Sequence, residues 1–129
     1  MSLPATQTQT TDVVCLVDDD ASIRRSITRM LQLEGVDVHA FGEPQEFLAY
    51  LAGNVVRLAI LDIWMEPMTG IEVLAHLCAQ SPQTRVIFIT GREDETAEQT
   101  VKQGGAFAFF MKPFDDNEFL RTVHRALDH

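Results

Sequence analysis

The sequence has few cysteines, no long apolar runs and few basic residues, which are the features that zinc or redox sites, membrane spans and nucleic-acid binding require. Only 2 of its 129 residues are cysteine, and Cys15 and Cys78 lack the C-x-x-C spacing of a zinc or redox site. Both lie in apolar segments, so we expect buried free thiols. No apolar run approaches the ~20 residues of a transmembrane helix, which argues against a membrane-spanning chain.

Basic side chains are also scarce. The chain has 10 lysines and arginines against 19 acidic residues, a net charge of −9. Nucleic-acid phosphates and anionic lipids repel a chain this acidic, so we expect it to bind neither nucleic acid nor membranes directly. Residues 1–12 are polar and lack the basic start and apolar core of a signal peptide, which predicts a disordered leader and a cytoplasmic location.

What the sequence does contain is a regular alternation of strand-like and helix-like segments. Its length and its hydrophobic fraction of 46% suit one domain, expected over residues 13–129. Apolar runs of strand length occur at 13–17, 36–41, 56–63, 85–90 and 107–111. Stretches with helical spacing occur at 22–34, 44–53, 70–80, 93–103 and 115–127. Strands joined by helices run parallel, so the pattern predicts an α/β fold with a doubly wound, five-stranded parallel sheet and five helices.

Acidic side chains gather where two of these strands end. Asp18, Asp19 and Asp20 follow the first strand, and Asp62 lies at the end of the apolar run of the third. The carboxyl ends of parallel strands meet at one edge of the sheet, so these carboxylates should come together there. Each pair would repel by about 1–4 kcal/mol near 4 Å, and a cation is needed to offset this. Carboxylates without histidine or cysteine are hard oxygen ligands, which predicts Mg²⁺.

Two further polar residues are expected at the same edge. Thr90 ends the fourth strand and carries a hydroxyl donor, while Lys112 follows the fifth and can place a positive charge beside a phosphoryl oxygen. Next to Mg²⁺, an aspartate can act as a nucleophile toward phosphorus and form an aspartyl phosphate. Asp62 is the candidate nucleophile, because it stands alone at the end of the central apolar strand.

These residues lie in four segments, VCLVDDDASIRR, LAILDIWMEPMTGIEVL, VIFITGRED and GGAFAFFMKPF. The segments resemble the signature segments of the receiver domains of bacterial two-component response regulators. The resemblance extends over nearly the whole chain from Val13 onward. It implies a flavodoxin-like sheet with strand order 2-1-3-4-5. It also implies transfer of a phosphoryl group to Asp62 from a phosphohistidine of a sensor histidine kinase.

The resemblance also assigns roles at the site. It implies that Mg²⁺ is bound by Asp19, Asp62 and the backbone carbonyl of Trp64, with Asp18 holding water molecules of the metal. It pairs Lys112 with the phosphoryl group and implies that the peptide bond after Lys112 is cis.

A conformational switch is implied as well. Thr90 would move toward the phosphate, and Phe109 would turn inward into the space that Thr90 leaves. The segments 93–103, 107–111 and 115–127 would form the face that changes, which such domains use for dimerisation or output. The helix 93–103 has few large apolar residues, so we expect it to be the least firmly packed.

The loop after the third strand departs from the family pattern D-x-x-M-P-x-x-x-G. Glu66 stands at the proline position, and Pro67 comes one residue later. Trp64 and Arg92 should place an indole and a cation on opposite sides of the expected phosphoryl site. We hypothesise that this pair slows spontaneous loss of the phosphate; the alternative is that Trp64 merely shields the loop.

Other charged residues have ordinary expected roles. Asp20 suits the start of a helix, where negative charge is favoured. Arg24 and Arg25 are expected on a solvated face, although this region of receivers contacts the kinase. The 4 histidines form no metal-binding spacing and are expected at the surface or partly packed.

Three functions are open on the sequence alone. The favoured one is a switch that is phosphorylated on its own Asp62, is not a turnover enzyme, and controls an output such as transcription; the segment ITG resembles LuxR-type regulators. A haloacid-dehalogenase-like phosphatase would also form an aspartyl phosphate with Mg²⁺, and the three consecutive acids partly mimic its motif. A degenerate receiver would be a constitutive interaction module, but the presence of both Thr90 and Lys112 beside the acids argues against it.

Overall fold

Strands and helices alternate along residues 13–128, the part of the chain that the computed structural model describes; the predicted leader lies outside the described residues. The strands are β1 (Val14–Val17), β2 (Val38–Phe41), β3 (Leu58–Asp62), β4 (Arg85–Thr90) and β5 (Ala108–Met111). The helices are α1 (Ala21–Leu33), α2 (Pro44–Gly53), α3 (Gly70–Gln80), α4 (Glu95–Gln103) and α5 (Asp116–Leu127). Each predicted element is present, with ends displaced by at most a few residues.

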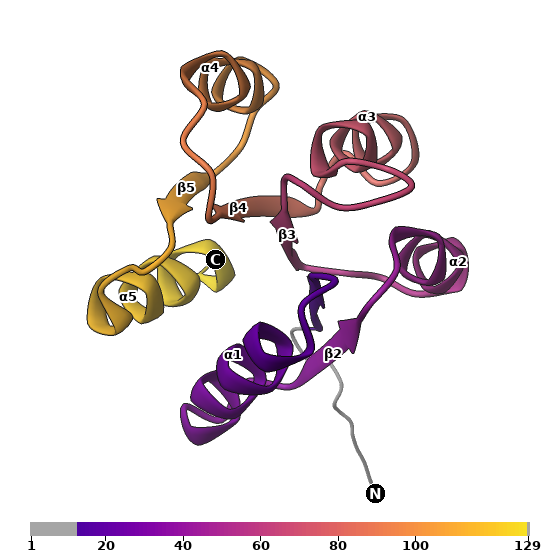
Figure 1. The fold of residues 1–129 in the computed structure, drawn as a ribbon. Helices are drawn as coiled ribbons and strands as arrows, with labels where there is room; N and C mark the ends of the chain where they lie inside the picture. Colours follow the sequence, from indigo (N-terminus) through magenta and orange to yellow (C-terminus); the bar gives the residue numbers. More distant parts are fainter. Residues whose placement is uncertain (1–12, 129) are drawn as a thin grey trace, which may run out of the picture.

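The strands form one parallel sheet in the order β2-β1-β3-β4-β5 (Figure 1). The predicted α/β fold and its strand order are therefore confirmed. In the central pair, Val17 of β1 lies opposite Leu61 of β3. Asp18 and Asp62, which come next on the two strands, consequently lie at the same edge of the sheet.

The sheet is covered on both faces. Helices α2, α3 and α4 lie over one face and α1 and α5 over the other (Figure 1). Along β1, Cys15 and Val17 pack into the core of the first face, and Val14 and Leu16 into that of the second. All four side chains are fully buried. Burial on both faces explains why these strands are continuous apolar runs rather than alternating ones.

Helices α5 and α4 differ in the size of the side chains that they bury. On the α1–α5 side, Phe119 packs against Phe110 and Phe114, with ring centroids 5.4 and 4.7 Å away. On the other side, α4 buries only Ala97 and Val101. Little apolar surface therefore holds α4 to the sheet, in line with the weak packing predicted for it.

The two cysteines have different surroundings. Cys15 is fully buried in β1, and desolvation raises the pKa of its thiol to about 12, which makes it unreactive. Cys78 is exposed on α3, so the prediction of two buried thiols was wrong for this residue. Residue 78 lies about 100° around the helix from the buried Leu77, which takes it off the stripe that faces the sheet.

None of the helices found within residues 13–128 combines the length and the apolar character needed to cross a bilayer.

Candidate functional site

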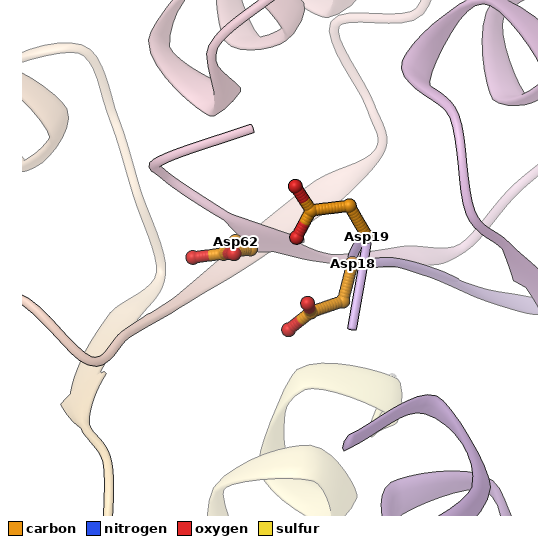
Figure 2. A group of neighbouring side chains, drawn as sticks. All are labelled: Asp18, Asp19 and Asp62. Carbon is orange, nitrogen blue, oxygen red and sulfur yellow. The ribbon is translucent and has the colours of Figure 1, made fainter. Parts of the chain in front are cut away.

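Three carboxylates meet at the carboxyl edge of the sheet. Asp18 and Asp19 follow β1, and Asp62 is the last residue of β3. Each offers one oxygen atom, and these atoms all lie within 4.8 Å of one another. Figure 2 shows the three side chains gathered where the two strands end. The convergence expected from the strand ends is present.

Asp18 is the most enclosed member of the group. Its side chain is fully buried, its Oδ1 accepts a hydrogen bond from the Asp20 N–H at 2.9 Å, and its Oδ2 lies 2.9 Å from Lys112 Nζ. The same ammonium is 4.0 Å from Asp62 Oδ2. Lys112 therefore neutralises Asp18 more closely than Asp62. A buried carboxylate with both oxygens engaged has little freedom to turn.

Asp62 carries an incompletely balanced charge. Burial is the main reason that its pKa rises to about 6, and the neighbouring Asp18 carboxylate raises it further. Lys112 and a 3.4 Å hydrogen bond from the Trp64 N–H act in the opposite direction, but more weakly. A second positive charge at this edge would relieve the repulsion and favour the ionised form of Asp62.

These residues fit a divalent cation with hard ligands. The donor set consists of carboxylate oxygens, and besides burial the Asp18 and Asp19 carboxylates raise the pKa of Asp62 although Lys112 lowers it. Mg²⁺ prefers oxygen ligands from one or two carboxylates together with water. Asp19 is exposed, so a hydrated ion can reach its carboxylate from solvent. The chemistry of the site thus agrees with the predicted cation.

Trp64 and Arg92 are in contact rather than on opposite sides of the site. The guanidinium carbon of Arg92 lies 4.2 Å from the centroid of the indole ring, a cation–π geometry. Both residues line a groove of about 500 Å³ that also includes Asp19 and Glu66. The indole N–H is buried and has no hydrogen-bond partner within residues 13–128. The sequence indicated both residues but not their stacking.

Thr90 is tied to the same loop. Its hydroxyl donates to the backbone carbonyl of Arg92 at 3.2 Å, and the Arg92 N–H donates to that hydroxyl at 3.1 Å. Its own carbonyl accepts the Lys112 N–H at 2.7 Å. The hydroxyl is therefore held by its own loop, and any movement toward Asp62 must break this turn.

A family model for the response regulator receiver domain matches residues 14–124. The chain belongs to this family. Receiver domains are signalling domains that generally bind Mg²⁺ at an acidic pocket and interact with histidine kinases, which agrees with the acidic group described above. Membership of this family argues against the phosphatase alternative.

The receiver resembles parts of longer curated proteins. It is 33% identical to nodulation protein W of Bradyrhizobium diazoefficiens over 95% of the chain and 54% of that protein. It is 36% identical to the DNA-binding transcriptional regulator NtrC of Salmonella typhimurium over 91% of the chain and 25% of that protein. The chain thus spans about half of the first relative and a quarter of the second.

Solved structures support the same assignment. A CheY-like receiver domain protein from Methanospirillum hungatei matches with a TM-score of 0.87 and 28% identity, over 92% of this chain and 95% of that one. The beryllofluoride-activated NtrC4 receiver domain dimer matches with a TM-score of 0.86 and 28% identity, over 91% and 97% of the two chains.

Phe109 and Lys112, two further residues that the resemblance singles out, lie in and directly after β5. Phe109 lies opposite Phe88 in the sheet and packs, partly buried, against the core on the α4 side. Phe110 packs into the opposite core, as strand alternation predicts. The bond after Lys112 is cis, as the resemblance implies, and the bond between Glu66 and Pro67 is cis as well.

Gly70, the first residue of α3, lies very close to the end of β3. A Cβ atom at this position would collide with the backbone carbonyl of Asp62. The Gly70 N–H also donates to the Ile63 carbonyl at 2.8 Å. The start of α3 is therefore pressed against the end of β3, and only glycine leaves room for this approach.

The sequence placed Asp20 correctly and Arg24 incorrectly. Asp20 caps α1 by accepting hydrogen bonds from the backbone N–H groups of Ser22 and Ile23. Arg25 is exposed, as expected, but Arg24 is half-buried and its Nη1 donates to the Asp18 carbonyl at 2.7 Å. The solvated face predicted for Arg24 was wrong, because α1 starts directly beside the end of β1.

Proposed function

We propose that this receiver accepts a phosphoryl group on Asp62 from a phosphohistidine of a sensor histidine kinase, with Mg²⁺, and thereby switches an output in transcriptional regulation. The observation that carries the proposal is the meeting of three carboxylates within 4.8 Å at an edge where Lys112 brings its ammonium 4.0 Å from Asp62. A regulatory output is supported by relatives that are themselves transcriptional regulators.

In the proposed reaction, a carboxylate oxygen of Asp62 attacks phosphorus. The bond between phosphorus and the imidazole nitrogen breaks, and its electron pair leaves with the imidazole, which takes up a proton. Asp19, Asp62 and the Trp64 carbonyl would hold Mg²⁺, with Asp18 holding its water. When bound, Mg²⁺ supplies positive charge to the phosphoryl oxygens. Lys112 is near enough to turn from Asp18 to one of these oxygens.

Stoichiometry tests this proposal. With acetyl phosphate and Mg²⁺, we expect uptake of up to one phosphoryl group per chain, measured by intact-protein mass spectrometry. Asp62→Asn should take up none, while Asp116→Asn, which removes an exposed acid at the start of α5, should behave as wild type. Release of many phosphates per chain would favour the phosphatase instead, and a folded wild type that takes up none would favour the degenerate receiver.

The switch is proposed to involve Thr90 and Phe109. Phosphorylation would draw the Thr90 hydroxyl from the Arg92 backbone toward the phosphate, and Phe109 would turn into the vacated space. Support comes from the small number of side chains that α4 buries, since such an element can occupy two positions of similar free energy. Amide exchange in α4 that differs between the free and phosphorylated chain would support this switch; unchanged exchange would contradict it.

A homodimer through α4, β5 and α5 is proposed for the phosphorylated state. The beryllofluoride-activated NtrC4 receiver domain is a dimer, and β5 carries the exposed apolar side chain of Met111. Sedimentation with and without beryllofluoride tests this, with Met111→Glu expected to weaken any dimer. A wild type that stays monomeric with beryllofluoride would contradict the dimer.

The stack of Trp64 and Arg92 is proposed to prolong the life of the phosphate. The pair lines the groove beside Asp19, where water must approach the phosphoryl group. Trp64→Ala and Arg92→Ala should each lose phosphate faster than wild type, because each breaks the same stack. Unchanged or slower loss in both variants would leave Trp64 with a shielding role in the loop only.

A further inference from the structure

Arg24 reaches out of α1 to the peptide that joins the two acids after β1. Its Nη1 donates to the Asp18 carbonyl at 2.7 Å, while its backbone N–H donates to the Asp20 carbonyl at 3.0 Å. Both ends of Arg24 are thus bonded to the segment that carries Asp18 and Asp19. This arrangement holds the orientation of the peptide between the two carboxylates.

Gly42, in the loop after β2, provides the space for this guanidinium. A Cβ atom at Gly42 would lie 3.0 Å from Arg24 Nη1 and 3.2 Å from its Cζ. These distances are tighter than ordinary van der Waals contact, so a Cβ atom at Gly42 would push the guanidinium away by a few tenths of an ångström. Gly42 is not among the glycines with positive φ, so alanine suits its backbone conformation and would act only by displacing Arg24.

The backbone of Asp18 is consequently held through both its N–H and its carbonyl group. Its N–H donates to the Phe41 carbonyl at 3.1 Å, and its carbonyl accepts from Arg24. Arg24 bonds to a carbonyl rather than to a carboxylate, which leaves the exposed Asp19 side chain available to a ligand. A planar guanidinium can lie flat on glycine and donate in its own plane, which an ammonium cannot do.

We propose that Arg24, lying on Gly42, is a positioning residue for the cation site: it orients the Asp18–Asp19 peptide so that both carboxylates face Asp62. This inference rests on the proposed binding of Mg²⁺ at that site. Groups that orient metal ligands from behind typically change metal affinity about 10–100-fold when removed. Arg24 would therefore act on cation affinity without touching the cation or the phosphate.

The test is a Mg²⁺ titration that does not involve phosphorylation. Trp64 is the only tryptophan of the chain and lines a groove with Asp19, so its fluorescence is a probe of cation binding, with calorimetry as a second measurement. Arg24→Ala should raise the Kd for Mg²⁺ about 10-fold. Arg25→Ala, which removes the exposed neighbouring arginine, should leave it unchanged. Urea unfolding without Mg²⁺ checks that each variant is folded.

Gly42→Ala separates positioning from general packing. It should raise the Kd in the same direction as Arg24→Ala, and the double variant should be no worse than Arg24→Ala alone, because both changes act through one guanidinium. Arg24→Lys should recover only part of the affinity.

Two results would overturn the inference. One is a folded Arg24→Ala variant with a Kd within twofold of wild type, and the other is a double variant whose effects simply add. A wild type that binds no Mg²⁺ would instead contradict the proposed function, so the two failures can be told apart.

Discussion

The site has two halves that are held in different ways. The anchored half consists of Asp18, Asp62 and Lys112, which lie at the ends of β1, β3 and β5 and are joined by buried or half-buried charge contacts. The stacked half consists of Trp64, Thr90 and Arg92, joined by a cation–π contact and by hydrogen bonds between the Thr90 hydroxyl and the Arg92 backbone.

The helices behind the two halves differ as well. Below the anchored half, α1 and α5 bury large side chains, including the fully buried Phe119. Beside the stacked half, α4 buries Ala97 and Val101 only. Elements that bury little apolar surface open at lower free energy than the core. We therefore expect α4 to open at a lower free energy than α5.

Truncating one core residue on each side tests this contrast most strongly. Phe119→Ala should lower the free energy of unfolding by about 3–5 kcal/mol, because it leaves a cavity beside the rings of Phe110 and Phe114. Val101→Ala should cost about 1–2 kcal/mol, since it removes only two methyl groups. Urea unfolding measures both values. An equal or larger loss for Val101→Ala would show that α4 is not the weaker side.

Removing the ammonium of the anchored half should have the next largest effect. Lys112→Met keeps the length of the apolar stem but leaves the buried Asp18 carboxylate without its 2.9 Å partner. We expect a loss of about 3 kcal/mol in the free energy of unfolding at pH 7.5 in EDTA. Excess Mg²⁺ should recover part of this loss, because it compensates the same carboxylates. A variant as stable as wild type in EDTA would contradict the anchoring role.

Neutralising Asp62 should stabilise the protein when Mg²⁺ is absent. Folding raises the pKa of Asp62 from 3.8 to about 6, so the folded protein binds the Asp62 proton more tightly than the unfolded chain. The stability gained in this way is fully present below about pH 4 and is lost as the pH rises through 6. Asp62→Asn avoids this loss and should be more stable than wild type at pH 7.5, by on the order of 1–3 kcal/mol. The gap should close toward pH 4 in thermal unfolding scans. A gap that is constant with pH would contradict the ionisation account.

The smallest expected effect lies in the stacked half. In a double-mutant cycle of Trp64→Ala and Arg92→Ala, the coupling energy should be about 0.5–1 kcal/mol, as for an exposed cation–π pair. Chemical unfolding of the four proteins gives the value. A coupling close to zero would mean that the stack does not stabilise the loops, and that any effect on phosphate lifetime has another cause.

Much of the fold and the positions of the site residues could be predicted, because they depend on patterns between neighbouring residues in the chain. Apolar runs of strand length that end at Asp18, Asp62 and Thr90 specify which residues reach the carboxyl edge once the strands are parallel. Asp20 was equally predictable, because a helix cap depends only on its neighbours in the chain. The roles of Phe109 and of the Trp64 carbonyl stay predictions, since they concern states with phosphate or metal bound.

The errors concern side chains whose surroundings come from distant parts of the chain. Cys78 was expected to be buried, but an apolar segment does not specify which side of the helix meets the sheet. Arg24 was expected in solvent, and its hydrogen bond to Asp18 depends on the space that Gly42 provides. Gly42 belongs to another strand connection, and no spacing within the helix reveals it.

The sequence by itself thus determined the alternation of elements, the parallel sheet and the residues at its carboxyl edge, because each follows from local pattern and chain connectivity. Only the tertiary structure decided which of those residues pair. Lys112 lies closer to Asp18 than to Asp62, Arg92 stacks on Trp64, and Arg24 holds the Asp18 carbonyl. Such pairing depends on distances of a few ångströms between side chains from different strand ends, which packing of the whole domain sets.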